Sequence, residues 1–235
     1  MRPVVGWSAI VAAAAVASSL TLAACGGNAE ATRSGPRILA DASAAINSVK
    51  SFRMSANVST SGGVGRFTFE VAGKGVGEGT FSLGNLQFQL EEDHATDYIK
   101  SSSLWSSVGG GALQQLLTGH WVSLPASNTL AQQLTGGLAA LTSPSQTAVS
   151  LTKGEPKARR AGTATVDGEG VVVVREAGGG EVLVATQGPP YPLEFRLGNG
   201  TTLYLSDFGG AFNIRPPAHS LSLLNVIAGL QSGAP

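Results

Sequence analysis

The sequence predicts an α+β fold in which a wide antiparallel sheet buries one face beneath helices. Much of the chain after residue 50 alternates apolar and polar residues with a period of two, which is typical of strands with one buried face. Glycine occupies 32 positions and charged residues only 13% of the chain, which favours short strands joined by tight turns. Residues 38–49 and parts of 104–141 instead repeat apolar residues at helical spacing. A sheet this wide must curl, and these helices are available to cover its apolar face.

The first 24 residues are predicted to be an export signal. Arg2 and the free amine are followed by an uncharged apolar run from Trp7 to Ala24, and then by Cys25, the only cysteine. Leu22-Ala23-Ala24-Cys25 resembles the lipobox of bacterial lipoproteins, which implies that a diacylglyceryl group joins the Cys25 thiol and that Cys25 becomes the mature N-terminus. The run is short and alanine-rich for a transmembrane anchor. A plain secretory signal would leave Cys25 unexplained, so we favour a lipid anchor on the extracytoplasmic face of the cell membrane.

The rest of the chain is predicted to be a tether and one domain. Residues 25–36 lack apolar periodicity and are typical of a flexible tether from the lipidated Cys25, and residues 37–235 are long enough for a single domain. A domain of this size buries about 70% of its unfolded surface and needs no disulfide. Without residues 1–24 the net charge is −1, and the sequence has no basic face, so we expect no nucleic-acid partner. We expect a monomer.

The first predicted elements are a helix and a series of strands. The helix begins after Ser34-Gly35-Pro36, which offers a cap and a proline suited to a first turn. Its apolar stripe comprises Ile38, Leu39, Ala42, Ala45, Ile46 and Val49. Strands are then expected over residues 52–58, 67–71, 81–83, 86–90 and 98–99. Gly73, Gly75, Gly77 and Gly79 alternate along the chain and would leave a smooth patch on a strand, but a loop is favoured because glycine weakens strands.

The second half is predicted to hold a helical insert and a meander of strands. Leucines 113, 116 and 117, and then 130, 134, 138 and 141, indicate helices on either side of an extended stretch at 120–125. Strands are expected over residues 148–151, 163–166, 171–174, 181–186, 191–197 and 201–208, with Asp167-Gly168 as a strong turn signal. Leucines 221, 224 and 230 with Ile227 predict a short closing helix.

Several segments together resemble a known family. They are residues 47–53, 98–100 with Trp105, 121–125, 165–168, 184–193 and 205–209. These are similar to actinobacterial lipoproteins of the LppX/LprA/LprF/LprG group and, more distantly, to the lipoprotein carrier LolA. The resemblance implies a half-barrel, which is a strongly curved antiparallel sheet with helices packed on its concave face. It also implies an apolar cavity between sheet and helices that holds acyl chains, and a role in carrying lipids or lipoglycans across the envelope.

The predicted function is therefore the binding of an apolar ligand by a membrane-anchored lipoprotein. Each buried methylene contributes about 0.8 kcal/mol, so one acyl chain can supply most of the binding free energy. The candidate lining residues are Phe52, Met54, Val58, Phe67, Phe69, Phe81, Phe88, Leu113, Leu117, Leu134 and Phe195. An alternative is an envelope stress sensor or regulator that binds protein with the same curved sheet, as RseB-like regulators do. A third interpretation is a structural lipoprotein with a solid core.

Trp105 and Trp121 would suit the mouth of a cavity, because amphipathic rings sit well where apolar surface meets water, although plain packing is favoured for both.

No motif indicates catalysis, a metal or a cofactor. The three histidines, His94, His120 and His219, lie far apart and have no partner at a metal-ligand spacing. Residues 150–153 match the Ser-x-x-Lys of penicillin-binding enzymes, but the Lys-Thr-Gly strand is missing and residues 206–208 match the Ser-Asp-Asn loop only in part. We therefore expect no enzyme activity. The acidic run Glu91-Glu92-Asp93 and the pair Arg159-Arg160 are interpreted as solvated surface.

Overall fold

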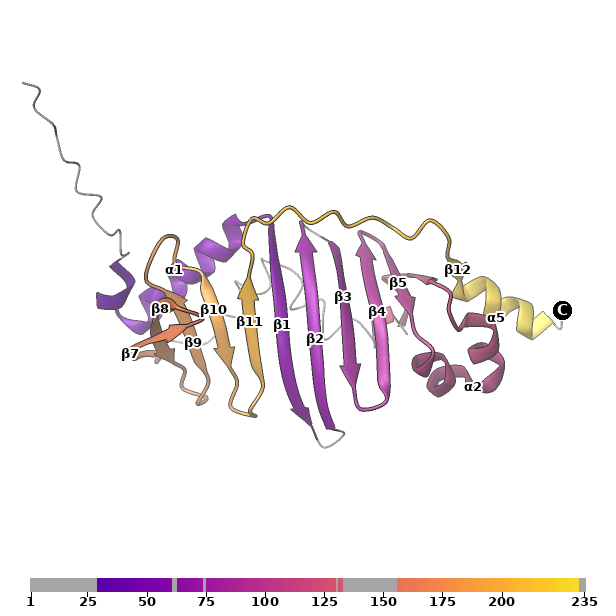
Figure 1. Cartoon of the computed structure of the whole chain (residues 1–235), viewed down its shortest axis with the longest axis horizontal. Coiled ribbons are helices and arrows are strands. Elements are labelled where there is room, and N and C mark those ends of the chain that lie inside the picture. The colour runs from indigo at the N-terminus through magenta and orange to yellow at the C-terminus, as the bar shows by residue number, and fades with distance from the viewer. Residues whose placement is uncertain (1–28, 61–62, 74, 130, 133–155, 233–235) are drawn as a thin grey trace, which may run out of the picture.

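The structure is a computed structural model that describes residues 29–60, 63–73, 75–129, 131–132 and 156–232 (Figure 1). Cys25 and the whole predicted export signal lie outside these residues, as do Leu134, the leucines predicted to form the second part of the helical insert, the strand predicted over 148–151, and the Ser-x-x-Lys match. The lipid attachment at Cys25 and the boundaries of the export signal, tether and domain therefore remain predictions.

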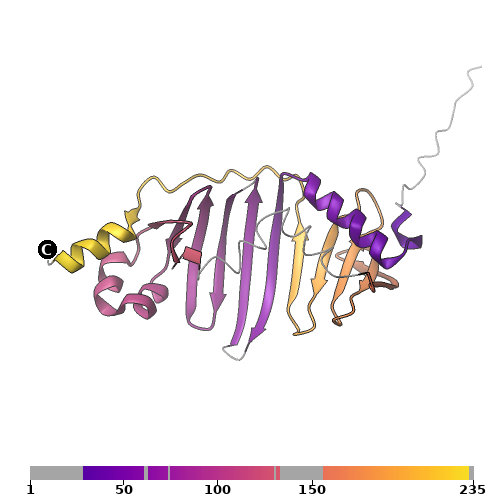
Figure 2. The same cartoon turned by 180° about the vertical axis from the view of Figure 1, so that it is seen from behind.

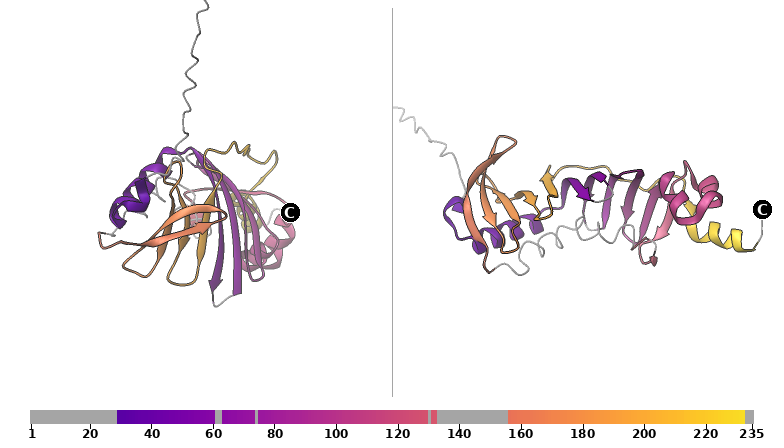
Figure 3. Two further views of the ribbon diagram at one scale, coloured as in Figure 1. Left: turned by 60° about the vertical axis from the view of Figure 1, so that its left-hand side comes forward. Right: turned by 90° about the horizontal axis from the view of Figure 1, so that it is seen from below.

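A sheet of 12 strands dominates the fold, in the order β12-β6-β5-β4-β3-β2-β1-β11-β10-β9-β8-β7. Two meanders, β1 to β6 and β7 to β11, meet where β1 pairs with β11, and all neighbours are antiparallel except the β12–β6 pair. Figure 3 shows that the sheet is strongly twisted and curved and does not close. The strands are Ser51–Thr60 (β1), Gly63–Ala72 (β2), Val76–Leu83 (β3), Leu86–Asp93 (β4), Thr96–Lys100 (β5), Val122–Pro125 (β6), Arg159–Val166 (β7), Glu169–Arg175 (β8), Glu181–Ala185 (β9), Pro192–Arg196 (β10), Thr202–Ser206 (β11) and Leu221–Ser222 (β12).

The alternating segments form the predicted strands. In β2, the apolar positions Phe67, Phe69 and Val71 are buried while the residues between them are half-buried. The predicted Asp167-Gly168 turn joins β7 to β8 with positive φ at both residues, 49° and 88°, as a two-residue hairpin of right-handed twist requires. The strand pattern therefore predicted the architecture, but the two-residue strand β12, which pairs in parallel with β6, had no sequence signal.

Helix α1 (Gly35–Ser48) covers one end of the sheet, where it packs on β7, β8, β9 and β10 (Figure 2). It begins after Ser34 with a proline in its first turn, as predicted, and buries Ile38, Leu39 and Ile46. The close approach to the sheet requires Gly35, because a Cβ there would lie 2.6 Å from the Ala158 carbonyl oxygen.

The other end of the sheet carries α2 (Ser103–Leu117) and α5 (Leu223–Ser232). Helix α2 packs on β4 and is kinked at Gly110, where φ is 68°. Helix α5 packs on β6 and β12 and contains Leu224, Ile227 and Leu230 of the predicted closing helix. Leu221, which was predicted to belong to it, lies in β12 instead. Between β11 and β12 the chain runs as an extended segment along the ends of the central strands (Figure 1). No helix of the described residues is long and apolar enough to cross a membrane.

Packed structure begins before the predicted domain boundary at residue 37. A 3₁₀ helix, η1 (Ala29–Thr32), lies within the predicted flexible tether, and its Glu30 is only 2% exposed. Arg33 forms ion pairs with Glu30 and with Asp41 of α1, which fastens this segment to the first helix.

Candidate functional site

One face of the sheet, hereafter the apolar face, gathers the predicted lining residues. Phe52, Met54, Phe67, Phe69, Phe88, Leu113 and Leu117 are at most 9% exposed and belong to one apolar cluster, and Val58, Phe81 and Phe195 are partly buried against it. Leu134 lies outside the described residues. The strand register explains this convergence, because Met54 is opposite both Phe69 and Leu205, and Phe67 is opposite Phe81. The prediction of which face is apolar is confirmed by burial; whether these residues line an open cavity stays a prediction.

Aromatic rings concentrate on the central strands of the apolar face. The rings of Phe81 and Phe88 lie 4.9 Å apart, and those of Phe67 and Phe69 lie 6.0 Å apart. Neighbouring helices make their main contacts elsewhere: α1 with β7 to β10, α2 with β4, and α5 with β6 and β12. The apolar face thus continues across β1, β2 and β3, between the strands on which the described helices chiefly pack.

The Phe69 ring packs against the backbone of two glycines in the neighbouring strand β3. Gly77 and Gly79 lie in β3 opposite Val71 and Phe69. A Cβ at Gly77 would fall 2.2 Å from the Phe69 ring, and one at Gly79 would fall 2.5 Å from it. The Phe69 side chain therefore covers the surface that the two glycines leave bare. The loop prediction for the alternating glycines holds for Gly73 and Gly75, which have positive φ and lie between β2 and β3. Gly77 and Gly79 are in strand β3, so for them it was wrong.

The candidate list missed the part of the apolar face nearest α1. Val172 and Val174 of β8 and Val182 and Val184 of β9 are at most 1% exposed and join the same cluster. The uninterrupted valine run from 171 to 174 was a usable signal, because strands buried on both faces have continuous apolar sequences. Val171 is indeed also fully buried, although it points to the opposite face from Val172.

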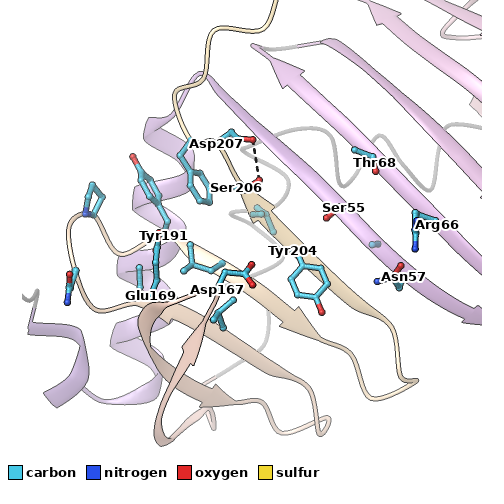
Figure 4. Close-up of a pocket in the computed structure, with 18 residues that line it drawn as sticks. Ser55, Asn57, Arg66, Thr68, Asp167, Glu169, Tyr191, Tyr204, Ser206 and Asp207 are labelled. Carbon is cyan, nitrogen blue, oxygen red and sulfur yellow. Dashed lines mark hydrogen bonds between the residues drawn. The ribbon is translucent and has the colours of Figure 1, made fainter.

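The opposite side of the sheet, hereafter the polar face, contains a cavity of about 830 Å³ (Figure 4). Its walls come from β1, β2 and β11 on one side and from the β7–β8 turn and the β9–β10 connection on the other. The β7–β8 turn thus reaches over the polar face toward β2. Hydroxyl, amide and charged groups predominate on the walls, among them Ser55, Asn57, Arg66, Asp167 and Tyr204 (Figure 4).

Two stacked aromatic rings form part of the wall of this cavity, hereafter the larger cavity. Tyr191 stacks on Phe208 with 4.1 Å between ring centroids, and Phe208 in turn lies 6.5 Å from Phe52. The backbone N–H of Gly209 donates to the Ser51 carbonyl, and the Ser51 hydroxyl donates to the Gly210 carbonyl, so the segment after β11 is fixed to the start of β1.

Ion pairs organise the charges along the polar face. Arg53 of β1 bridges Glu70 of β2, at 2.7 Å, and Asp207 after β11, and these contacts raise the pKa of the guanidinium further. At the far end, Arg175 and Arg196 both pair with Glu181, and hydrogen bonding from Arg175 holds the Glu181 pKa below its usual value.

A second cavity of about 310 Å³ lies farther along the polar face, over β2, β3 and β4. Glu70, Glu78, Glu91 and Trp121 contribute to its walls. Glu91 is only 5% exposed, so the interpretation of the acidic run as solvated surface was wrong for this residue. Burial, together with the neighbouring negative charges of Glu78 and Asp93, raises the pKa of Glu91 to about 7.

The two tryptophans and the histidines have separate surroundings. Trp105 is fully buried in the apolar cluster, and its Nε1 has no hydrogen-bond partner among the described residues. Trp121 is half-buried beside the second cavity, with the Lys100 ammonium 6.0 Å from its ring centre. His94 lies in the β4–β5 turn, 2.6 Å from Asp93. No group of three or more metal-binding side chains comes together within the described residues.

Comparison with known proteins identifies the fold. No protein-family model matches this chain, and no curated protein matches it. Among solved structures, LprF from Mycobacterium bovis matches 79% of this chain and 97% of its own, at 14% identity and a TM-score of 0.53. The lipoprotein LppX from Mycobacterium tuberculosis matches 77% of this chain and 99% of its own, at 14% identity and a TM-score of 0.48.

The class defined by this architecture is an α+β protein built on a curved, unclosed sheet. Within that class the chain has the fold of LprF, which the sequence resemblance predicted and the structural likeness confirms.

Proposed function

We propose that this protein is a membrane-anchored envelope lipoprotein that binds the acyl chains of a lipid against the apolar face of its sheet. The observation that carries the proposal is the phenylalanine-rich centre of that face, on β1 to β3, which lies between the strands chiefly contacted by α1 and by α2 and α5. Hydrocarbon is the ligand that such a surface favours, because each methylene removed from water contributes about 0.8 kcal/mol and needs no directional partner. The fold shared with LprF supports the proposal.

The location follows from the lipobox-like sequence at Cys25. Two acyl chains on the thiol would hold the protein at the membrane stably, where a single chain binds only marginally. A lipid-binding protein tethered in this way would remain next to the source of its ligand. The fold shared with LprF does not specify a ligand, so the identity of the bound lipid has to be measured.

A matched pair of variants on β1 tests where an acyl chain binds. Ala56 is 5% exposed on the apolar face, and its neighbour Ser55 lines the larger cavity on the polar face. Ala56→Phe fills space on the apolar side and is expected to lower lipid occupancy several-fold, while Ser55→Phe adds the same ring on the other side and leaves it unchanged. Mass spectrometry of organic extracts and displacement of a fluorescent fatty acid measure occupancy, and thermal unfolding checks that both variants fold.

Two results would contradict the proposal. The protein could yield no copurifying lipid and fail to bind apolar probes, or Ser55→Phe could reduce lipid binding as much as Ala56→Phe does. The anchor is tested separately by Cys25→Ser, which is expected to release the protein from membranes or to block its processing. Unchanged lipid labelling of that variant would leave the export prediction without support.

A further inference from the structure

Register aligns a row of side chains across the polar face. Arg53, Glu70, Glu78, Glu91 and Tyr98 stand on consecutive strands β1 to β5, each opposite the next. Side chains directly opposite in an antiparallel pair have Cβ atoms about 5 Å apart, so the three glutamates are near neighbours. Arg53 is the arginine of this row, and its positive charge is divided between two carboxylates because it pairs with both Glu70 and Asp207.

Glu91 differs from the other buried glutamates of the described chain. Glu30 is 2% exposed and pairs with Arg33 at 2.9 Å, and Glu194 is 5% exposed and pairs with Arg196 at 2.6 Å. Glu91 is equally buried, yet it has no ion pair within the described residues and its Oε1 atom has no hydrogen-bond partner. Buried carboxylates are normally paired or hydrogen-bonded, so an unpaired one beside a cavity indicates a missing positive partner.

The cavity beside Glu91 has the size and walls for a small organic cation. Its volume of about 310 Å³ corresponds to the liquid volume of about ten water molecules. Glu78, which also has no ion pair in the described chain, adds a second negative charge, and the Trp121 ring adds a π surface that attracts cations. Thr68, Thr80 and Gln89 supply hydrogen-bonding groups. Within the described residues, these carboxylates do not form a group of three or more metal-binding side chains.

We propose that this cavity binds an organic ammonium ion, whose charge is neutralised by Glu91 and Glu78 and whose alkyl part rests on Trp121. The chemistry further favours an amine without an attached anion. The phosphate of a zwitterionic headgroup would lie close to Glu70, Glu78 and Asp93 and be repelled by them. The site is on the opposite side of the sheet from the proposed acyl-binding surface. Ammonium binding and acyl-chain binding can therefore be tested independently of each other.

Protonation of Glu91 links this site to pH. The charged and titratable groups around it are Glu78 on β3, Glu70 on β2, Asp93 on β4, and Tyr98 and Lys100 on β5. Lys100 is held 6.0 Å over the Trp121 ring and forms no ion pair with Glu91. Binding of a cation favours the ionised carboxylate, so ammonium affinity should rise as pH increases through about 7 and should become constant above it.

Calorimetric titration of the purified protein with 1,4-diaminobutane at pH 6, 7 and 8 tests the proposal. We expect binding that strengthens with pH, no binding of the neutral analogue 1-butanol, and at least tenfold weaker binding of phosphoethanolamine. Glu91→Gln should weaken diamine binding at least tenfold and remove the pH dependence. Glu169→Gln, which removes a carboxylate of the larger cavity on the same face, is the matched control and should change neither.

Three results would overturn the proposal: no binding at millimolar diamine, equal binding of butanol, or wild-type affinity in a folded Glu91→Gln variant. If Glu91→Gln does not fold, Trp121→Leu replaces it, because it keeps every carboxylate and removes only the ring. Weakening of diamine binding by Trp121→Leu supports the assignment, and unchanged binding overturns it. Preferential binding of phosphoethanolamine would contradict the exclusion of an attached anion and with it the amine class proposed.

Discussion

The two faces of β1 to β4 are built from alternate residues of the same strands, yet they are stabilised by opposite means. On the apolar face, Phe69 fits onto bare glycine backbone and is 1% exposed. On the polar face, Glu91 is nearly as buried, and within the described residues its Oε1 atom has no hydrogen-bond partner. The comparison shows that a buried side chain does not always stabilise the fold. Burial of apolar rings on one face drives folding, whereas burial of a carboxylate on the other face costs desolvation free energy.

The largest effect is expected on the apolar face. Phe69→Ala should destabilise the protein by about 3–5 kcal/mol, because it removes a buried ring and uncovers Gly77 and Gly79. Gly77→Ala alone should cost about 1–3 kcal/mol, since its Cβ would fall 2.2 Å from that ring. In the Phe69→Ala background the ring no longer blocks this methyl group, and the nearest remaining atom is the Glu70 carbonyl oxygen, 3.0 Å from the Cβ position, so Gly77→Ala should cost much less there.

Chemical denaturation of the two single variants and the double variant measures this coupling. Gly79→Ala is the control within the same strand, because its Cβ would also fall 2.2 Å from the Thr68 carbonyl oxygen, which belongs to the backbone and cannot be cleared by truncating Phe69. Additive free energies for Phe69→Ala and Gly77→Ala would show that the ring does not rest on the glycine.

The contrast between the faces also separates what the sequence could predict from what it could not. Period-two alternation is a local property, so the strands, the apolar face and most of its candidate residues could be predicted from segments such as 67–71. The Gly77–Phe69 contact depends on the register between β2 and β3, which alternation does not specify. For the same reason alternating glycines next to a turn could not be distinguished from a loop.

The polar face was harder to predict because its properties arise from distant parts of the chain. Glu91 is a polar residue in an acidic run, and local reasoning assigns it to solvent. Its surroundings come together only in the folded sheet. Trp121, for example, lines the same cavity but lies about 30 residues later in the chain. The larger cavity likewise needs the β7–β8 turn to reach toward β2, about 100 residues earlier.

An intermediate effect is expected from the pH dependence of stability. The folded-state pKa of Glu91 is raised to about 7 from an ordinary value of 4.5, so the folded protein binds the proton more tightly than the unfolded chain does. Stability should therefore decrease as pH rises from about 4.5 through 7, by about 2–3 kcal/mol for this group, and change little above that. Glu91→Gln should remove this slope and be more stable than the parent at pH 8.

Denaturant unfolding at pH 5 and pH 8 measures the slope for each protein. Glu194→Gln is the matched control, because Glu194 is a buried glutamate of the same face whose partner Arg196 is in place. Its replacement should lower stability at pH 8 instead of raising it, since Arg196 would lose a hydrogen-bonded carboxylate. A Glu91→Gln variant less stable than the parent at pH 8 would show that the carboxylate is not a cost to the fold.

The smallest effect is expected for the ion pairs of the polar face that are exposed to solvent. Arg53 is 42% exposed at its side chain, so its ion pairs with Glu70 and Asp207 are screened by water and salt. Arg53→Gln should cost about 1 kcal/mol or less at low salt, and this cost should shrink in 0.5 M NaCl. Arg175→Gln, in the exposed pair with Glu181, should behave alike.

The two substitutions should differ in their effect on the pH dependence of stability. Arg53 neutralises Glu70, whose charge raises the pKa of Glu78. Only Arg53→Gln should therefore steepen the loss of stability between pH 5 and 8. Equal slopes in the two variants would mean that the charge of Glu70 does not act on Glu78 across the row.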